Sequence, residues 1–135
     1  MPKKEVPISH LQDYLPAGTY EPVLAYLREY KVHLTIARER KSILGDYRHS
    51  THYANHRISV NGNLNQWSFL ITLLHELAHL LTFERYGNRV MSHGVEWKTF
   101  YSAILARFLE HGVFPADIEA ALKQSLRTPA ASSCA

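Results

Sequence analysis

The sequence predicts an α+β fold, because strand-like and helix-like segments occupy different parts of the chain. Between residues 32 and 61, apolar and polar residues alternate over short runs, as they do in half-buried strands. From about residue 65, apolar residues recur every three or four positions, as they do on a helix. Three short strands joined by short loops predict a small antiparallel three-stranded sheet, in which each strand pairs with the next.

Each element of the N-terminal half has its own signal. Apolar residues at helical spacing, with Glu and Pro in the first turn, predict a helix over residues 21–30. The alternation in KVHLTIAR predicts a strand over 32–37. Two more strands are expected, over 43–49 and over 56–61, the second ending in the turn sequence Asn61-Gly62-Asn63.

Three helices are expected in the C-terminal half. The first starts near Asn65, is apolar nearly all round, and stops at Gly87, a typical C-terminal cap residue. The second follows Ser92-His93-Gly94 and ends at Gly112, and Pro115 then opens a short third helix. The large aromatic side chains at helical spacing are interpreted as core residues: Trp67, Trp97, Phe100 and Phe108.

The length of 135 residues predicts a single domain. We expect a flexible segment over 1–19, the folded domain over 20–127 and a disordered tail over 128–135. No apolar stretch follows the basic N-terminus and no run of 18 apolar residues exists, which favours a cytoplasmic protein without membrane contact. We also expect a monomer.

Charge and cysteine content limit which partners and which kinds of metal site the chain can have. The net charge of +3 and the pI of about 9.1 permit contact with nucleic acid without requiring it. The one cysteine, Cys134, excludes an intramolecular disulfide and a zinc site built from several cysteines. A metal site would therefore use histidines and carboxylates, and the chain has nine histidines.

The apolar helix carries His75, Glu76 and His79 in its middle, in the order H-E-x-x-H. Two histidines four residues apart lie on one face of a helix, so both imidazoles can reach one Zn²⁺. Glu76 lies beside them, where a carboxylate can take a proton from a water molecule that attacks a carbonyl. The competing interpretation is a pair of core histidines that bond to nearby carbonyls or carboxylates.

A catalytic zinc usually has three protein ligands, so the third must come from elsewhere. The motif with another histidine six residues after His79 is excluded, because Arg85 stands there and Thr82 replaces its glycine. The remaining candidates are His93, Glu96 and, more remotely, Glu110. His93 begins a helix that a short loop can fold back along the first, and Glu96 is the alternative.

HELAH, followed by SHGVEW thirteen positions after His79, resembles the SprT-like zinc metallopeptidases, the family of SprT and Spartan. The upstream text LGDYRH and HRISVN is also similar to that family, and the resemblance covers about residues 20 to 112. It implies one zinc ion per chain, with His75, His79 and His93 as its ligands and Glu76 as the general base. It also implies a zincin-like α+β fold, a minimal metalloprotease domain with its active-site helices on a small antiparallel sheet.

The same resemblance bears on substrate and partners. Spartan is a protease that trims proteins covalently trapped on DNA, so the resemblance implies a protein or peptide substrate and points to repair of DNA–protein crosslinks. Many members carry a Cys-rich zinc ribbon after the protease domain, and this chain lacks the cysteines for one. The alternative hypothesis is a non-proteolytic adaptor that binds DNA or protein and is stabilised by its metal.

Three further features are weighed against simpler interpretations. Tyr47 is a possible transition-state stabiliser, although packing is favoured. The histidines 49, 52 and 56 could form an accessory metal site, but exposed loop residues are favoured. DNA could lie along the five basic residues between positions 38 and 57, or these could be a solvated sheet edge. They are Arg38, Arg40, Lys41, Arg48 and Arg57.

Overall fold

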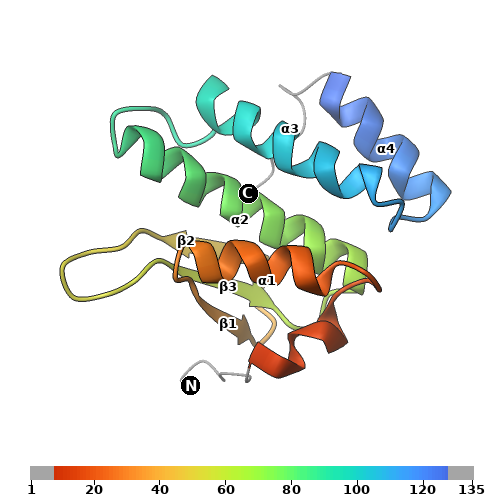
Figure 1. The fold of residues 1–135 in the computed structure, drawn as a ribbon, viewed down its shortest axis with the longest axis horizontal. Helices are drawn as coiled ribbons and strands as arrows, with labels where there is room; N and C mark the ends of the chain where they lie inside the picture. The colour runs from red at the N-terminus through yellow and green to blue at the C-terminus, as the bar shows by residue number, and fades with distance from the viewer. Residues whose placement is uncertain (1–7, 128–135) are drawn as a thin grey trace.

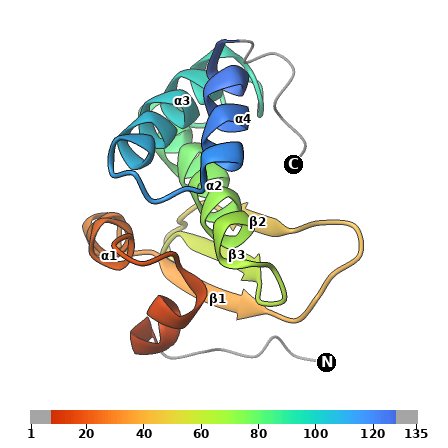
Figure 2. The same cartoon turned by 90° about the vertical axis from the view of Figure 1, so that its right-hand side faces the viewer.

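The computed structural model describes residues 8–127 and shows a layered α+β arrangement (Figure 1). The sheet forms one layer, the long helix α2 lies across it, and α3 and α4 lie on the other side of α2 (Figures 1 and 2). The elements in chain order are the 3-10 helix η1 (Ile8–Tyr14), α1 (Tyr20–Glu29), β1 (His33–Ala37), β2 (Gly45–Arg48), β3 (Arg57–Asn61), α2 (Gln66–Tyr86), α3 (Val95–Glu110) and α4 (Ala116–Arg127). The α+β class and the predicted strands and main helices are confirmed.

The sheet is mixed, so the prediction of an antiparallel sheet is wrong. The strand order is β1-β3-β2, with β1 parallel and β2 antiparallel to β3. The reason is that β3, buried at four of its five positions, takes the centre, where both its edges are paired. Asn61 at its end holds the β1–β2 connection: its N–H donates to the Leu44 carbonyl at 2.9 Å, and its side-chain amide donates to the Ile43 carbonyl at 2.9 Å. The chain therefore crosses the end of β3 before β2 begins.

Helix α2 is the centre of the core. Asn65 caps its N-terminus by accepting a hydrogen bond from the Ser68 N–H at 2.9 Å. Gly87 ends it with a φ of 62°, which suits glycine, and donates its N–H to the Phe83 carbonyl at 2.7 Å. Its fully buried leucines pack on the sheet on one side and on α3 on the other. The expected burial nearly all round is confirmed.

The helix α3 runs back along α2 (Figure 1) and presents aromatic side chains to it. Trp97 and Phe108 are buried, as the sequence predicts for core residues, while Trp67 and Phe100 are only partly buried. Because α3 starts just after His93, its packing on α2 positions that histidine.

The N-terminal region is ordered further upstream than the sequence suggested. Residues 8–19 were expected to be flexible, but η1 places Leu11 in the core at 0% exposure, and Leu15 is also buried. The apolar face of α1 adds Val23, Leu24 and Leu27 to the buried residues. The expected tail over 128–135, with Cys134, and residues 1–7 lie outside the described residues. No helix within residues 8–127 is long and apolar enough to cross a membrane.

Candidate metal centre and the cleft beside it

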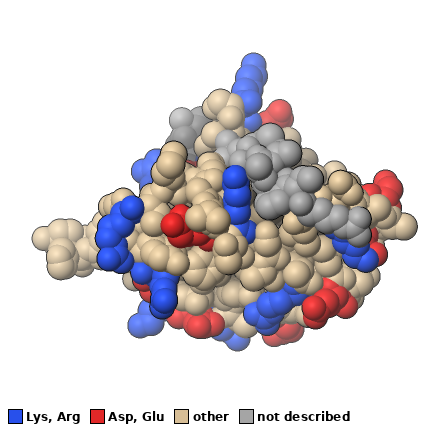
Figure 3. All heavy atoms as spheres, turned by 90° about the horizontal axis from the view of Figure 1, so that it is seen from above, with Lys and Arg blue, Asp and Glu red and all other residues tan. Residues whose placement is uncertain are grey.

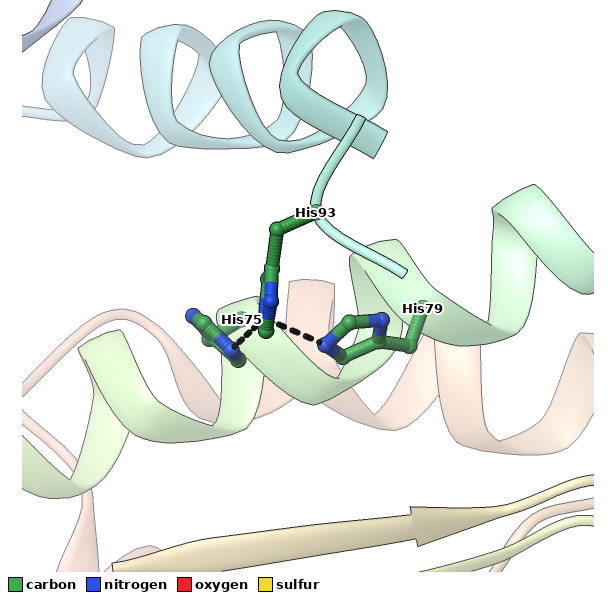
Figure 4. A group of neighbouring side chains, drawn as sticks. All are labelled: His75, His79 and His93. Atoms are coloured by element: carbon green, nitrogen blue, oxygen red, sulfur yellow. Dashed lines mark hydrogen bonds between the residues drawn. The ribbon is translucent and has the colours of Figure 1, made fainter. Parts of the chain in front are cut away.

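Three imidazole rings from two separate segments converge on one point (Figure 4). His75 and His79 come from the middle of α2, one helical turn apart, and His93 comes from the loop that leads into α3. The Nε2 atom of His93 lies 3.1 Å from that of His79 and 3.3 Å from that of His75. Glu96 and Glu110, the other ligand candidates, do not belong to this cluster.

The arrangement of the three nitrogens fits a metal ion. Zn–N bonds of about 2.0–2.1 Å at tetrahedral angles place ligand nitrogens about 3.3–3.4 Å apart, close to the separations observed here. Each of the two contacts of His93 Nε2 can be a hydrogen bond only if one of the two nitrogens carries a proton, whereas a metal ion would use the lone pairs of all three rings. The three histidines can hold a metal ion.

Burial keeps these imidazoles neutral, which leaves a lone pair on each for a metal. Burial, with a smaller contribution from His93, lowers the pKa of His75 to about 4. Burial and the two neighbouring histidines lower the pKa of His79 to about 3. The pKa of His93 is also lowered, by burial and then by Lys98.

Trp97, in the first turn of α3, forms the wall behind the histidines. Its indole N–H donates to the His75 carbonyl at 3.3 Å. Its ring lies 5.3 Å from the His79 ring at an interplanar angle of 29°, and stacks on Tyr101 at 5.0 Å and 9°. This aromatic wall covers one side of the site and ties α3 to the helix that carries His75 and His79.

Glu76, a residue of α2, is buried with 6% exposure, and its carboxyl group faces the edge strand β2. Burial raises the pKa of its carboxyl to about 8; Asp46 raises it further and Arg40 opposes the shift. A cation held by the adjacent histidines would lower that pKa and favour the carboxylate. Glu76 and the histidines His79 and His93 line one cavity of about 320 Å³, with Gly45 and Tyr47 on the β2 side.

The close approach of β2 to Glu76 depends on Gly45. A Cβ atom at this position would lie 2.6 Å from the Thr72 Cγ2 atom and 3.2 Å from the Glu76 Oε2 atom. It would also lie 3.1 Å from the Ser59 carbonyl oxygen. Only glycine lets the strand pass this close to the helix without displacing one of them.

Tyr47 belongs to a hydrogen-bond chain that crosses from β2 to α2. Its hydroxyl lies 2.9 Å from the Nδ1 atom of His56, and the Nε2 atom of His56 lies 2.8 Å from the Glu84 carboxylate. The Ser50 N–H also points to that Nδ1 atom, at 3.2 Å. Nδ1 must therefore be an acceptor, so Nε2 carries the proton toward Glu84 and the Tyr47 hydroxyl donates to His56. A transition-state role for Tyr47 stays a prediction, and it requires the hydroxyl to leave this bond.

The second group of histidines does not share one environment. His49 and His52 are exposed, as expected for loop residues, but His56 is buried at 4% exposure, so that expectation is wrong for it. The difference arises because His56 immediately precedes the central strand β3, and Tyr47 and Glu84 satisfy both of its ring nitrogens. These three histidines form no metal cluster among the residues that the structure describes.

A model of the SprT-like family matches residues 20–119 of the chain. The chain belongs to the SprT-like family. Searches of curated proteins and of solved structures each return no significant match. Family membership and the histidine cluster together point to a metallopeptidase-like protein whose three histidines can hold a metal ion.

The basic residues of this SprT-like chain fall into two groups. Arg40 is used inside the fold, because its guanidinium donates to the Asn61 side chain at 2.7 Å and to the Ser59 hydroxyl at 3.0 Å. Arg48 is exposed and pairs with Asp46 at 3.3 Å. The other three, Arg38, Lys41 and Arg57, are exposed. Basic and acidic side chains are intermingled on the face in Figure 3.

Sequence reasoning missed three residues that shape this site. Gly45 was part of the family-like text LGDYRH, but a glycine in a short strand does not by itself signal a close contact. Glu84 was not singled out, although its spacing from Glu76 is close to two helical turns. Trp97 was interpreted as a core residue only, and nothing local indicates that its N–H bonds to the His75 carbonyl.

Proposed function

We propose that this SprT-like protein is a zinc-dependent endopeptidase that hydrolyses peptide bonds with an activated water molecule. The observation that carries the proposal is a buried carboxylate, Glu76, in the same cavity as the converging His79 and His93 rings, with His75 completing the cluster. Zinc is favoured over other ions because the donors are three neutral imidazoles, and the His93 Nε2 atom lies at near-tetrahedral separations from the other two. The fourth position would stay open, as in catalytic zinc sites.

The residues of the chain divide the chemistry between them. His75, His79 and His93 would hold the ion, which supplies a Lewis acid that lowers the pKa of water and polarises a carbonyl oxygen. Glu76 holds the attacking water as an acceptor and removes its proton while the water oxygen bonds to the carbonyl carbon. Glu76 then gives that proton to the amine nitrogen as the carbon–nitrogen bond breaks.

The substrate is proposed to bind as an extended segment along β2. Within the described residues, β2 is an edge strand, since its only partner is β3. Its residues Gly45 to Tyr47 line the cavity that contains Glu76. A peptide that adds to this edge would place a backbone carbonyl beside the histidines, with its hydrogen bonds supplied by the strand. Folded domains would not fit this mode, so unfolded or extended segments are the expected substrates.

The test compares wild type with Glu76→Gln, each assayed for metal content and for hydrolysis of a quenched fluorescent casein. Because glutamine keeps the shape but cannot act as a base, the variant should retain one zinc per chain and lose at least about 100-fold in rate. A wild-type protein that binds zinc but shows no hydrolysis, or a Glu76→Gln variant with full activity, would contradict the proposal. If wild type and Glu76→Gln bind DNA or protein equally well and neither hydrolyses casein, the adaptor function would be supported instead.

We extend the proposal to proteins bound or crosslinked to DNA, with the protein acting as a monomer. The support is that Arg38, Lys41, Arg48 and Arg57 are exposed and that Arg48 lines the cleft next to His79. Contact with phosphates should appear as DNA affinity that falls steeply with added salt. Replacing the four basic residues by glutamine should flatten that dependence, whereas Arg40→Gln should destabilise the fold. Affinity that is unaffected by the fourfold variant would remove DNA from the proposal.

A further inference from the structure

A second cavity continues the cleft beyond the histidines. It has a volume of about 530 Å³ and shares Tyr47, His79 and Ser92 with the smaller cavity that contains Glu76. The two cavities are therefore neighbours on either side of these shared residues, and the larger one extends toward the C-terminal end of α2. The larger part is walled by β2 and the loop after it on one side, and by residues 87–92 on the other.

The walls of this larger cavity are mostly uncharged. Phe83 from α2 stacks against His49, with ring centroids 4.2 Å apart and an interplanar angle of 8°. Val90 and Met91 line the opposite side, and the Met91 side chain is 79% exposed. None of the lining residues is acidic, and the lining Arg48 is paired with Asp46. The cavity therefore offers aromatic and aliphatic contacts beside polar groups such as Asn88 and Ser92, and no lining carboxylate would pair with a substrate lysine or arginine.

The β2-side wall is held in place before any ligand binds. His56 accepts hydrogen bonds from the Tyr47 hydroxyl and the Ser50 N–H, and its other nitrogen bonds to Glu84 on α2. The strand, the loop after it and the helix are thus joined through one buried ring. A preformed cavity costs less ordering on binding than one that must open.

We propose that this cavity is the pocket for a substrate side chain, and that it selects extended segments with a bulky apolar residue, aromatic or long aliphatic, close to the bond that is cleaved. This inference rests on the proposed peptidase function, since it names the substrate class of that site. In a segment lying along β2, alternate side chains point to the same side about 6–7 Å apart, so one of them can enter a cavity that opens beside His79. Glycine would leave the pocket empty, and a lysine would bury its charge without a partner.

The experiment measures binding and cleavage separately. Zinc-loaded Glu76→Gln protein is titrated with labelled ten-residue peptides that are identical except for Phe, Leu, Gly or Lys at one central position, and fluorescence anisotropy is followed. Wild type is then given the same peptides, and the products are analysed by mass spectrometry. The Phe and Leu peptides should bind and be cleaved roughly tenfold or more better than the Gly and Lys peptides. Cleavage should occur within two residues of the varied position.

A pair of surface variants tests the pocket itself. Met91→Glu places an acid on the cavity wall at an exposed site, so the variant should fold normally. It should bind the Phe peptide roughly tenfold more weakly than wild type does, and the Lys peptide more tightly. Val95→Glu is the matched control, because Val95 is similarly exposed at 70%, lies two residues beyond His93 and does not line the cavity. It should leave the preference unchanged.

The outcomes separate the two proposals. Efficient cleavage with equal rates for all four peptides would overturn the pocket and leave the peptidase intact. Selective binding of the Phe and Leu peptides without cleavage by wild type would support the pocket and overturn the peptidase. Equal effects of Met91→Glu and Val95→Glu on the preference would overturn the pocket, and absence of both binding and cleavage would overturn both proposals.

Discussion

Replacing Gly45 by alanine tests whether the edge strand β2 and the helix α2 meet as closely as described. The added Cβ atom would lie 2.6 Å from the Thr72 Cγ2 atom, where carbon atoms normally stay about 3.5–4.0 Å apart. Threonine has only two favoured χ1 rotamers on a helix, so unless its methyl group moves to the other rotamer position, β2 must move from α2. Overpacking of this kind costs about 1–3 kcal/mol, partly offset by up to about 1 kcal/mol because alanine reduces the entropy of the unfolded chain.

The same substitution should also disturb catalysis. The new Cβ atom would lie 3.2 Å from the Glu76 Oε2 atom, so the carboxylate would shift by a few tenths of an ångström. Since a displacement of about 1 Å can cost about 100-fold in rate, a loss of roughly three- to tenfold in kcat is expected. Zinc content should be unchanged, because the histidines are not among the nearest contacts of Gly45.

The assay combines urea unfolding in EDTA with hydrolysis by the zinc-loaded protein. Thr72→Ser removes only the Cγ2 methyl group, so the double variant with Gly45→Ala should recover about 1 kcal/mol relative to the sum of the single changes. Its rate should recover only in part, because the contact with Glu76 remains. Additive free energies of unfolding, or a Gly45→Ala variant equal to wild type in stability and rate, would refute the close approach of β2 to α2.

Three further predictions concern the metal, the hydrogen-bond chain and the core. His93→Ala should lose most of its zinc by elemental mass spectrometry, because two histidines alone hold the ion weakly; full retention would point to another ligand, such as Glu96. Tyr47→Phe should lower the free energy of unfolding by about 0.5–1.5 kcal/mol, because it removes the bond to His56. Its rate should stay within about threefold of wild type, whereas a 100-fold loss would identify Tyr47 as a transition-state stabiliser. Leu74→Ala should cost about 2–5 kcal/mol in urea unfolding, since this side chain is 0% exposed, and a loss below about 1 kcal/mol would contradict its place in the core.

Much of the fold could be predicted because its signals are local. The ends of α2 followed from Asn65 and Gly87, and its burial followed from apolar residues on every side. The pairing of His75 with His79 needed only the 3.6-residue period of a helix. The limits of β2 and β3 were predicted to within two residues by alternation and by the turn after Asn61.

The parts that could not be predicted depend on contacts between distant segments. Alternation indicates that a segment is a strand but not which strands it pairs with. The central place of β3 and the parallel pairing of β1 therefore could not be predicted from the sequence. His56 has the same side chain as His49 and His52, and only its position before the central strand buries it. Residue spacing alone left His93, Glu96 and Glu110 as candidate ligands, the family resemblance favoured His93, and the return of α3 along α2 brings His93 to the other two histidines.

The sequence by itself determined the helix, the paired histidines with Glu76 between them, and the prediction of a metal site, because these follow from neighbours within two helical turns. The tertiary structure decided the third histidine, the glycine contact that lets β2 lie against Glu76, and the cavity beside His79. The physical reason is range. Backbone hydrogen bonds and side-chain periodicity act over a few residues, whereas a cleft exists only where packing brings separate segments together.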